Sequence, residues 1–535
     1  MPGVRAFAGI IVASSIYVGC SALEWSPALA AQVTLLKNIE FIGIAFLPPL
    51  TICSYVDFTG HSAWLRHRVR VALFVFAALN LAVKWSDPWL HLVHQEFWIV
   101  PKEGWNAQHI VDSNRFEAVY LIETALDPAY VGEVLAGEQS CGTFARVDGE
   151  TDLLRERARA TVESVEELEP SSTPSLPNGW MQRHGLMNRS GPWRRARLRV
   201  SFPIANVGAN LPTLAAMISG NLFDLGEVTG LRLQSIKLPR TYREQFDMPK
   251  QGITGTRQLT GVHGRPLIGT IIKPNVGLSA EETGTLAGRL CATGVDFIKD
   301  DEVCANPAHA PLAERVKSVM RRVRDHQEKT GKLVMVAFNI TDETDAMRRH
   351  ADLIESEGGT CVMASLNWCG YSAIQTLRRH TSLALHGHRN GYGALSRHPL
   401  LGFSYQAWQT LWRLAGVDHM HVHGLQGKFS QTDEEVIASA HDTLTPLCEG
   451  LDDRVLPAFS NGQWAGTVPV TWNSVHSNDL LFMSGGGILA HPDGPAAGVV
   501  SLQQAWDAVQ HGQSLAERAL QSQELRNALD FFGKM

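Results

Sequence analysis

One pattern of hydrophobic and polar positions repeats along the chain after Arg265. Each unit has a short apolar run, then a polar or glycine-bearing end, then a stretch with helical periodicity. The apolar runs are PLIGTIIK, GVDFIKDD, KLVMVAFNI, TCVMASLN, LALHGHR, VDHMHVHG, VLPAFS and DLLFMSGGG. Strands that alternate with helices indicate a parallel sheet, and eight consecutive units are typical of a closed (β/α)8 TIM barrel. The pattern therefore predicts an α/β fold with a C-terminal barrel.

The region before the barrel has a mixed pattern. NRFEAVYLIETALDP, which begins at Asn114, alternates like a strand, and similar alternation returns over Ala196–Gly208. Between them, Glu166–Gly179 is rich in proline and serine and is expected to form a loop. We therefore expect an α+β domain of the ferredoxin-like type over residues 114–255 and the barrel domain over 256–535.

The start of the chain differs in its pattern of hydrophobic residues, with three apolar runs at Ala6–Leu23, Phe41–Val56 and Val71–Val83. The first is close to the ~20 residues that cross a bilayer, and the others are borderline. The basic stretch RHRVR lies between the second and third runs and favours a cytoplasmic loop there. We expect a helical, hydrophobic, membrane-type segment over residues 1–103. A cleaved signal peptide is the alternative, because small residues follow the first run, but two further apolar runs count against it.

Composition and charge narrow the range of functions. A chain of 535 residues exceeds one ordinary core, so two or three domains are expected. The net charge of -6 argues against a nucleic-acid partner. The 8 cysteines form no CxxC pair, which fits reduced thiols in a cytoplasmic catalytic part better than a disulfide framework. We expect a cytoplasmic catalytic domain, with the N-terminal segment as a membrane anchor.

Polar side chains gather where the predicted barrel strands end. The chemistry of this fold sits at the C-terminal ends of its strands. The residues at those ends are Lys273, Lys299, Asp301, Glu302, His388, Arg389, His421 and Ser460. This distribution predicts an active site at the mouth of the barrel.

The second strand ends in one lysine and three carboxylates. Alternation puts Lys299 and Asp301 on one face, and Glu302 follows where the strand leaves the barrel. Two carboxylates with a further oxygen ligand suit Mg²⁺, which prefers hard oxygen donors. The lysine is either a counter-ion or, after carbamylation by CO2, an oxygen ligand. A solvated charge run at a strand end is the alternative for this stretch taken alone.

Other strand ends offer an acid/base group and anion contacts. Lys273 ends the first strand, and Ser279 with Glu282 forms a capping box for the helix that follows. A lysine beside a metal can serve as acid or base. The pair His388 and Arg389 suits a phosphate or carboxylate. The glycine-bearing turns SNG and SGGG, after strands seven and eight, suit a phosphate, although each alone could be a turn without a ligand.

The sixth strand, DHMHVHG, resembles a zinc motif but is not expected to bind zinc. His419, His421 and His423 lie two residues apart and are spread along about 13 Å by the strand rise. Three such side chains cannot reach one ion at ~2 Å. We keep His421 as a phosphate contact and expect His419 to be structural. Lys428, behind glycines in the next loop, fits a mobile lid.

From Asn114 to Phe532 the chain resembles the RuBisCO superfamily. The stretches that carry the resemblance are GTIIKPNVGLS, GVDFIKDDE, HGHR, GVDHMHVHGLQGK and SGGGILAHPDGPAAG, in the family's order. It implies that Lys299 is the lysine carbamylated in true RuBisCO, with Asp301 and Glu302 as the other Mg²⁺ ligands. It implies that Lys273 is the catalytic acid/base and Lys428 the lid lysine.

The same resemblance implies the substrate contacts and a shared active site. In the barrel the expected substrate or phosphate contacts are His388, Arg389, His421, Ser460, Asn461, Gly462, Gly485, Gly486 and Gly487. In the N-terminal domain, LAGEQSCGTF and SGNLFD resemble segments that complete the partner subunit's site, which implies Glu138, Thr143 and Asn221. A homodimer with shared active sites is therefore expected.

Four departures from the family pattern separate this chain from the carboxylases. The family's second lysine after the Lys-Pro dipeptide is Asn275, its tryptophan after Gly142-Thr143 is Phe144, a histidine is Tyr392, and a glycine is Asn461. These changes leave the metal site intact and alter the pocket for CO2 and a bisphosphate. The chain thus resembles a RuBisCO-like protein, of the group called form IV.

The expected chemistry passes through an enediolate on a phosphorylated sugar or sugar acid. KPNVGLS, HGHRNGYGALSRHP and SNGQWAG resemble the branch that decarboxylates 3-oxo-isoapionate 4-phosphate to erythrulose phosphate and CO2, a carboxy-lyase reaction. The alternatives are the enolase and isomerase reactions of methionine salvage and, less favoured, ribulose-bisphosphate carboxylation. A sensor that binds a sugar phosphate without turnover is the non-enzyme alternative, and the complete lysine and carboxylate set argues against it.

The N-terminal segment has a resemblance of its own. LLKNIEFIGIAFLPPLTICSYVDFTGH resembles the start of the multi-helix membrane sensor region of bacterial histidine kinases. Only about three helices of such a region are expected here, with no kinase domain after them. We interpret residues 1–100 as a truncated membrane module fused to an enzyme.

Overall fold

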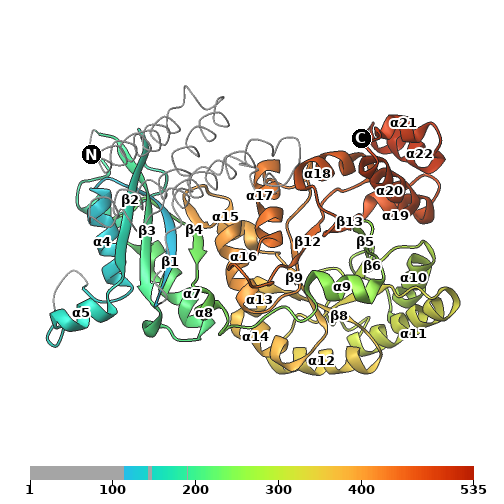
Figure 1. Ribbon diagram of the computed structural model, residues 1–535, viewed down its shortest axis with the longest axis horizontal. Coiled ribbons are helices and arrows are strands. Elements are labelled where there is room, and N and C mark those ends of the chain that lie inside the picture. Colours follow the sequence, from blue (N-terminus) through green and yellow to red (C-terminus); the bar gives the residue numbers. More distant parts are fainter. Residues whose placement is uncertain (1–113, 143–146, 189–190, 535) are drawn as a thin grey trace, which may run out of the picture. The chain divides into compact units, whose positions relative to one another are not determined.

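The computed structural model describes residues 114–142, 147–188 and 191–534, shown in colour in Figure 1. The expected membrane-type segment over residues 1–103 lies outside the described residues. Within those ranges, no helix is both long enough and apolar enough to cross a bilayer.

Eight parallel strands form a closed barrel, as the sequence pattern predicts. In order around the barrel they are β5 (Leu267–Ile271), β6 (Phe297–Lys299), β7 (Met335–Asn339), β8 (Cys361–Ser365), β9 (Ala384–His388), β11 (His419–His421), β12 (Leu456–Phe459) and β13 (Leu481–Met483), which pairs with β5. All eight apolar runs named above contain one of these strands. Buried apolar side chains such as Phe297, Met335 and Leu481 fill the interior, so the barrel is a packed core.

The barrel part of the chain contains many helices, most of which surround the strands (Figure 1). They are α10 (Ala280–Ala292), α11 (Leu312–Thr330), α12 (Thr344–Ser356), α13 (Leu366–Cys369), α14 (Tyr371–His380), α15 (Tyr392–Ser396), α16 (Tyr405–Leu414), α17 (Asp433–Leu444), α18 (Val468–Val475), α19 (Gly486–Leu489), α20 (Pro495–Gln510), α21 (Leu515–Ala519) and α22 (Gln523–Phe532). The predicted capping box is present at the start of α10, where Ser279 and Glu282 bond each other's backbone N–H.

The part of the chain before the barrel contributes four strands to a five-stranded sheet and also contains helices. Its strands are β1 (Arg115–Thr124), β2 (Thr161–Ser171), β3 (Trp193–Pro203) and β4 (Gly230–Lys237), in the order β4-β1-β3-β2 and antiparallel. β10 (Leu401–Phe403), from the barrel part of the chain, adds a parallel strand beside β4. Its helices are α4 (Pro128–Glu138), α5 (Asp152–Ala158), α6 (Gly179–Arg183), α7 (Leu211–Ser219) and α8 (Arg240–Arg243).

The loop expected over Glu166–Gly179 is wrong in its first part. β2 extends to Ser171 and forms the edge of the sheet against β3. The glutamates of this stretch are cross-strand partners, since Glu166 pairs with Arg197 at 2.6 Å and Glu167 with Arg194 at 2.6 Å. An edge strand needs few apolar residues, so the composition of this stretch does not distinguish a strand from a loop.

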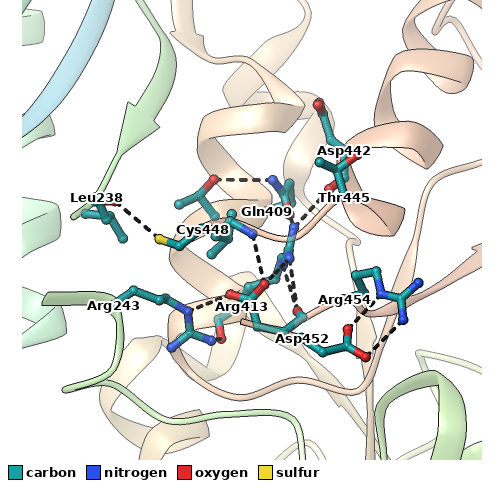
Figure 2. Close-up of polar contacts among 12 residues, drawn as sticks. Leu238, Arg243, Gln409, Arg413, Asp442, Thr445, Cys448, Asp452 and Arg454 are labelled. Atoms are coloured by element: carbon teal, nitrogen blue, oxygen red, sulfur yellow. Dashed lines mark hydrogen bonds and ion pairs between the residues drawn. The ribbon is translucent and has the colours of Figure 1, made fainter. Parts of the chain in front are cut away.

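Buried charges tie the segment after the N-terminal sheet to the barrel (Figure 2). Arg243 Nε on α8 donates to Asp453 Oδ2 at 2.6 Å, and Arg413 Nη2 on α16 donates to Asp453 Oδ1 at 2.7 Å. All three side chains are fully buried. A carboxylate in this position would be costly alone, and two guanidinium groups compensate it. The thiol of Cys448 adds a contact to the carbonyl oxygen of Leu238 at 3.3 Å.

The short helix α9 (Gly252–Thr260) is fixed against the N-terminal ends of the barrel strands. Asp418, just before β11, accepts hydrogen bonds from the backbone N–H groups of Gln251 and Gly252, both at 2.7 Å. Its other carboxylate oxygen accepts from Arg378 at 2.7 Å. Ile253 packs with the side chains of the barrel interior. These contacts fix α9 at the end opposite to the predicted active site.

Candidate active site

Lys273 and Asp301 form an ion pair at the mouth of the barrel. Lys273 Nζ donates to Asp301 Oδ2 at 2.7 Å and to Asn275 Oδ1 at 2.6 Å. The lysine side chain is 41% exposed, whereas Asp301 is 3% exposed. Asn275, the departure from the family's second lysine, therefore orients Lys273. An ammonium with one side toward solvent and one toward a buried carboxylate can donate a proton and then be reprotonated from solvent.

Lys299 is buried beside the second carboxylate. Its Nζ lies 3.6 Å from Glu302 Oε2 and donates to the carbonyl oxygen of Asp300 at 2.9 Å. Burial lowers the pKa of Lys299, although the nearby carboxylates act in the opposite direction. The neutral amine is the form that reacts with CO2 to give a carbamate and a proton. The charges of both Glu302 and Asp301 act on Lys299, so the two carboxylates lie near its amine.

Asp300 has a different role from its two neighbours. Its carboxylate is buried and accepts from Arg315 Nη2 at 3.2 Å and from the backbone N–H of Asn339 at 3.1 Å. The Asn339 side chain donates to the carbonyl oxygens of Asp301 and Glu302 at 3.0 and 3.1 Å. Asn339 thus holds the backbone that carries both carboxylates. Sequence reasoning missed it, although its place at the end of a barrel strand was a signal.

Arg389 is a buried cation with an unused donor. Its guanidinium carbon lies 4.5 Å from the ring centroid of Tyr392 and 5.0 Å from that of Tyr405. Burial lowers its pKa, and its Nη1 is buried without a hydrogen-bond partner. A buried donor of this kind is stabilised by an incoming anion. Tyr392, another departure from the family, thus serves as an aromatic platform for Arg389.

Two histidines lie close together, and one of them is close to Glu302. His388 Nε2 is 3.6 Å from Glu302 Oε2, and its ring centroid is 4.4 Å from that of His421. Burial lowers the pKa of both rings well below the usual range, so both are neutral near pH 7. His421 Nδ1 is hydrogen-bonded to Ser460 Oγ at 3.0 Å.

The glycine-bearing turns have unequal environments. A Cβ built on Gly427 would lie 2.6 Å from Asn461 Nδ2, so the loop with Lys428 packs on the SNG turn. Asn461 has φ 80° and Gly462 φ 77°, a conformation that asparagine tolerates better than most residues. A Cβ on Gly486 would meet nothing within 4 Å, and one on Gly485 would meet only Ile271 Cδ1 at 3.7 Å, whereas a Cβ on Gly487 would lie 2.6 Å from Ser484 Oγ. Gly487 is therefore required for packing.

Carboxylates and histidines alone do not form a metal site here. Among the residues that the structure describes, no group of three or more His, Cys, Asp or Glu side chains is placed to hold a metal ion. The oxygen set at the mouth has two carboxylates, and its third member is a lysine. A carbamate on Lys299 would add an oxygen ligand to the two carboxylates, and the resulting oxygen set fits Mg²⁺.

The comparison with known families decides the identity of the catalytic part. Residues 252–532 match the model of the ribulose bisphosphate carboxylase large chain, catalytic domain. This chain belongs to the RuBisCO family. Residues 1–125 match the N-terminal 7TM region of histidine kinase, which confirms the second predicted resemblance.

Similar proteins place the chain in the RuBisCO-like group. It is 48% identical over 420 residues to the 3-oxo-isoapionate-4-phosphate transcarboxylase/hydrolase of Xanthobacter autotrophicus, covering 78% of this chain and 100% of that protein. It is 40% identical over 415 residues to the 3-oxo-isoapionate-4-phosphate decarboxylase of Rhizobium rhizogenes, covering 77% and 97%. The crystal structure of a rubisco-like protein from Burkholderia fungorum has 64% identity and a TM-score of 0.74, covering 78% and 100%. The predicted RuBisCO-like family is confirmed.

The residues expected to complete a partner's site lie on the N-terminal domain of this RuBisCO-like chain. Glu138 ends α4 and Asn221 follows α7, and both are exposed. The two segments adjoin, because a Cβ on Gly220 would lie 3.5 Å from Gln139 Nε2. Thr143 and Phe144 lie outside the described residues.

Proposed function

We propose that this RuBisCO-like enzyme decarboxylates 3-oxo-isoapionate 4-phosphate to erythrulose phosphate and CO2. The observation that carries the proposal is the pair of Lys273 and Asp301 at the barrel mouth, 2.7 Å apart, which provides a proton donor beside an oxygen set suited to a metal. Two relatives of 40% and 48% identity are named for reactions of this substrate. Arg389, with an unpaired buried donor, supplies a contact for the phosphate.

The residues fit Mg²⁺ as the cofactor. Asp301 and Glu302 offer hard carboxylate oxygens, and Lys299 would add a carbamate oxygen. When bound, Mg²⁺ supplies a Lewis acid that polarises a carbonyl oxygen. The lowered pKa of Lys299 supports the carbamate, because it favours the neutral amine.

The proton balance of the reaction assigns Lys273 its role. The substrate is a β-keto acid, so breaking the bond to its carboxylate releases CO2 and leaves the electron pair in an enediolate. One proton must then reach the carbon that lost the carboxylate. Lys273 donates it, and the exposed side of its ammonium is recharged from solvent. Asn275 and Asp301 hold the donor in place.

The transcarboxylase/hydrolase reaction is a second candidate, favoured by the relative with 48% identity. It uses the same substrate but differs in the fate of the carboxyl carbon. A decarboxylase releases that carbon as CO2, whereas a transcarboxylase retains it on an organic product. Substrate labelled with ¹³C in its carboxylate separates the two reactions.

The test is turnover by the full chain with Mg²⁺ and bicarbonate. Phosphorus NMR identifies the phosphorylated product, and mass spectrometry follows the ¹³C label. Erythrulose phosphate with labelled CO2 supports the decarboxylase. Label retained on an acid supports the second candidate. If neither forms and a methylthio-pentulose phosphate or its diketone is isomerised instead, the proposed substrate is wrong.

Arg389→Lys is expected to raise KM for the phosphorylated substrate by about tenfold, with a smaller effect on kcat. Lysine cannot reproduce the planar guanidinium that lies over the rings of Tyr392 and Tyr405. Tyr392→Phe is the matched control, because it keeps the ring and loses only the hydroxyl that donates to the Phe403 carbonyl oxygen. Steady-state kinetics of both variants check this. An unchanged KM in Arg389→Lys would contradict a phosphate role.

We propose in addition that the enzyme is a homodimer. Glu138 and Asn221 are exposed on adjoining segments, which leaves them available to a second copy's barrel mouth. We also propose that the catalytic part lies in the cytoplasm, where a sugar-phosphate substrate is found. The match of residues 1–125 to a 7TM region supports attachment to a membrane.

A further inference from the structure

A chain of buried histidines runs through the barrel from α9 to the active site. His419 Nε2 contacts Thr256 Oγ1 at 2.7 Å, and His419 Nδ1 contacts His386 Nδ1 at 3.4 Å. His386 Nε2 contacts His421 Nε2 at 2.8 Å, and His421 Nδ1 contacts Ser460 Oγ at 3.0 Å. All three imidazoles are buried. Of these contacts, only the one between His421 and Ser460 lies among the residues of the candidate active site.

The strand register explains why these rings meet. β9 and β11 are neighbours, and His419 is directly opposite His386. His421 is two residues further along β11 and faces the same interior. Asp418 fixes the start of α9 through two backbone N–H groups, which puts Thr256, one turn later, against His419.

At the α9 end of the histidine chain, the direction of the hydrogen bonds is fixed. Thr256 Oγ1 lies 2.6 Å from the carbonyl oxygen of Gly252, which can only accept. The single hydroxyl proton of Thr256 therefore points to Gly252. Its oxygen is left as an acceptor for a proton on His419 Nε2.

The direction of this hydrogen bond fixes the direction of each following one, because a neutral imidazole has one N–H that donates and one bare nitrogen that accepts. Burial lowers the pKa of His419 to about 4 and lowers those of His386 and His421 well below the usual range, so all three are neutral near pH 7. His419 protonated at Nε2 requires His386 to be protonated at Nδ1. His386 then accepts at Nε2 from His421, whose bare Nδ1 accepts from the Ser460 hydroxyl.

We propose that Thr256 is a positioning residue that sets the tautomer of His421 and the direction of the Ser460 hydroxyl from the far end of the barrel. Because the Ser460 proton is bound to His421, the Ser460 oxygen faces the site as an acceptor. It suits a substrate hydroxyl group and not a phosphate oxygen. This consequence for the substrate rests on the proposed function, whereas the tautomers do not.

Histidine labelled with ¹³C and ¹⁵N in the full chain tests the tautomers directly. Magic-angle-spinning spectra show whether each protonated ring nitrogen is bonded to Cδ2, as Nε2 is, or to Cγ, as Nδ1 is. We expect His419 and His421 to be protonated at Nε2 and His386 at Nδ1. Protonation of His421 at Nδ1 would overturn the proposal, with or without turnover of any substrate.

Thr256→Val removes the acceptor that fixes the direction. We expect His421 to populate the Nδ1 tautomer and kcat to fall about tenfold, the effect of one misdirected hydrogen bond. Thr256→Ser keeps the hydroxyl and should restore both. Thr260→Val is the matched control, since Thr260 lies on the same helix and its hydroxyl donates to the Thr256 carbonyl oxygen, not to a histidine. Equal spectra and equal kcat in Thr256→Val and Thr260→Val would overturn the proposal.

The two hypotheses fail separately. A wild-type enzyme that leaves 3-oxo-isoapionate 4-phosphate unchanged contradicts the proposed function, while the spectra still decide the tautomers. A wild-type enzyme that turns over this substrate with His421 protonated at Nδ1 supports the proposed function and overturns the role of Thr256.

Discussion

Replacement of Lys273 by methionine is expected to lower kcat for 3-oxo-isoapionate 4-phosphate by about a thousandfold, the usual effect of losing a general acid. Methionine keeps much of the length and volume of the side chain but carries no proton to donate. Asp301, which loses a partner at 2.7 Å, remains available to Mg²⁺. Mg²⁺ binding should therefore persist while turnover is lost.

Lys250→Met is the matched control for this prediction. Lys250 is a structural lysine, whose Nζ donates to the Thr381 carbonyl oxygen at 2.9 Å. Its replacement should leave kcat within a few-fold of wild type. Steady-state kinetics and calorimetric titration with Mg²⁺ measure both variants. A Lys273→Met enzyme with wild-type kcat would show that the proton comes from another group.

Lys299→Arg is expected to weaken Mg²⁺ binding by more than about a hundredfold, since even the loss of a group behind a metal ligand costs up to that factor. A guanidinium stays charged and forms no carbamate under these conditions. Turnover should fall with the metal. Wild-type enzyme should bind Mg²⁺ more tightly with CO2 present than in CO2-free buffer, and the variant should show no such difference.

A second lysine on the same part of the chain provides the control. Lys332 Nζ pairs with Asp296 Oδ1 at 2.7 Å, before the start of β6. Lys332→Arg can keep this pair and should bind Mg²⁺ as wild type does. Calorimetry with and without bicarbonate measures all three proteins. Equal Mg²⁺ affinity in Lys299→Arg and wild type would remove Lys299 from the metal site.

The barrel and the core of its site could be predicted because both depend on local periodicity. Alternation along one strand places Lys299 and Asp301 on the same side, and the parallel arrangement brings Lys273 to the same end. Asp300, out of phase with its neighbours, points away to Arg315, as alternation requires. Nothing beyond strand direction and residue order is needed for these results.

Contacts between distant elements could not be predicted in this way. Asn339 acts on the backbone of another strand, and Arg389 depends on two tyrosine rings from different helices. The link from Thr256 to His419 requires the register of α9 beneath the barrel. The strand β10 joins a sheet whose other strands come from a much earlier part of the chain. Leu401 of β10, for example, pairs with Leu231 of β4. The pattern of hydrophobic and polar residues within one segment does not show which distant element that segment contacts.

The fate of the substrate's carboxyl carbon in D2O tests most directly whether the enzyme decarboxylates its substrate and protonates the product from Lys273. The full chain, with Mg²⁺ and bicarbonate, is given 3-oxo-isoapionate 4-phosphate labelled with ¹³C in the carboxylate. We expect one labelled CO2 for each erythrulose phosphate formed and one deuterium on the carbon that lost the carboxylate. Both should be lost in Lys273→Met. Labelled substrate recovered unchanged, beside wild-type isomerisation of a methylthio-pentulose phosphate, would contradict this expectation.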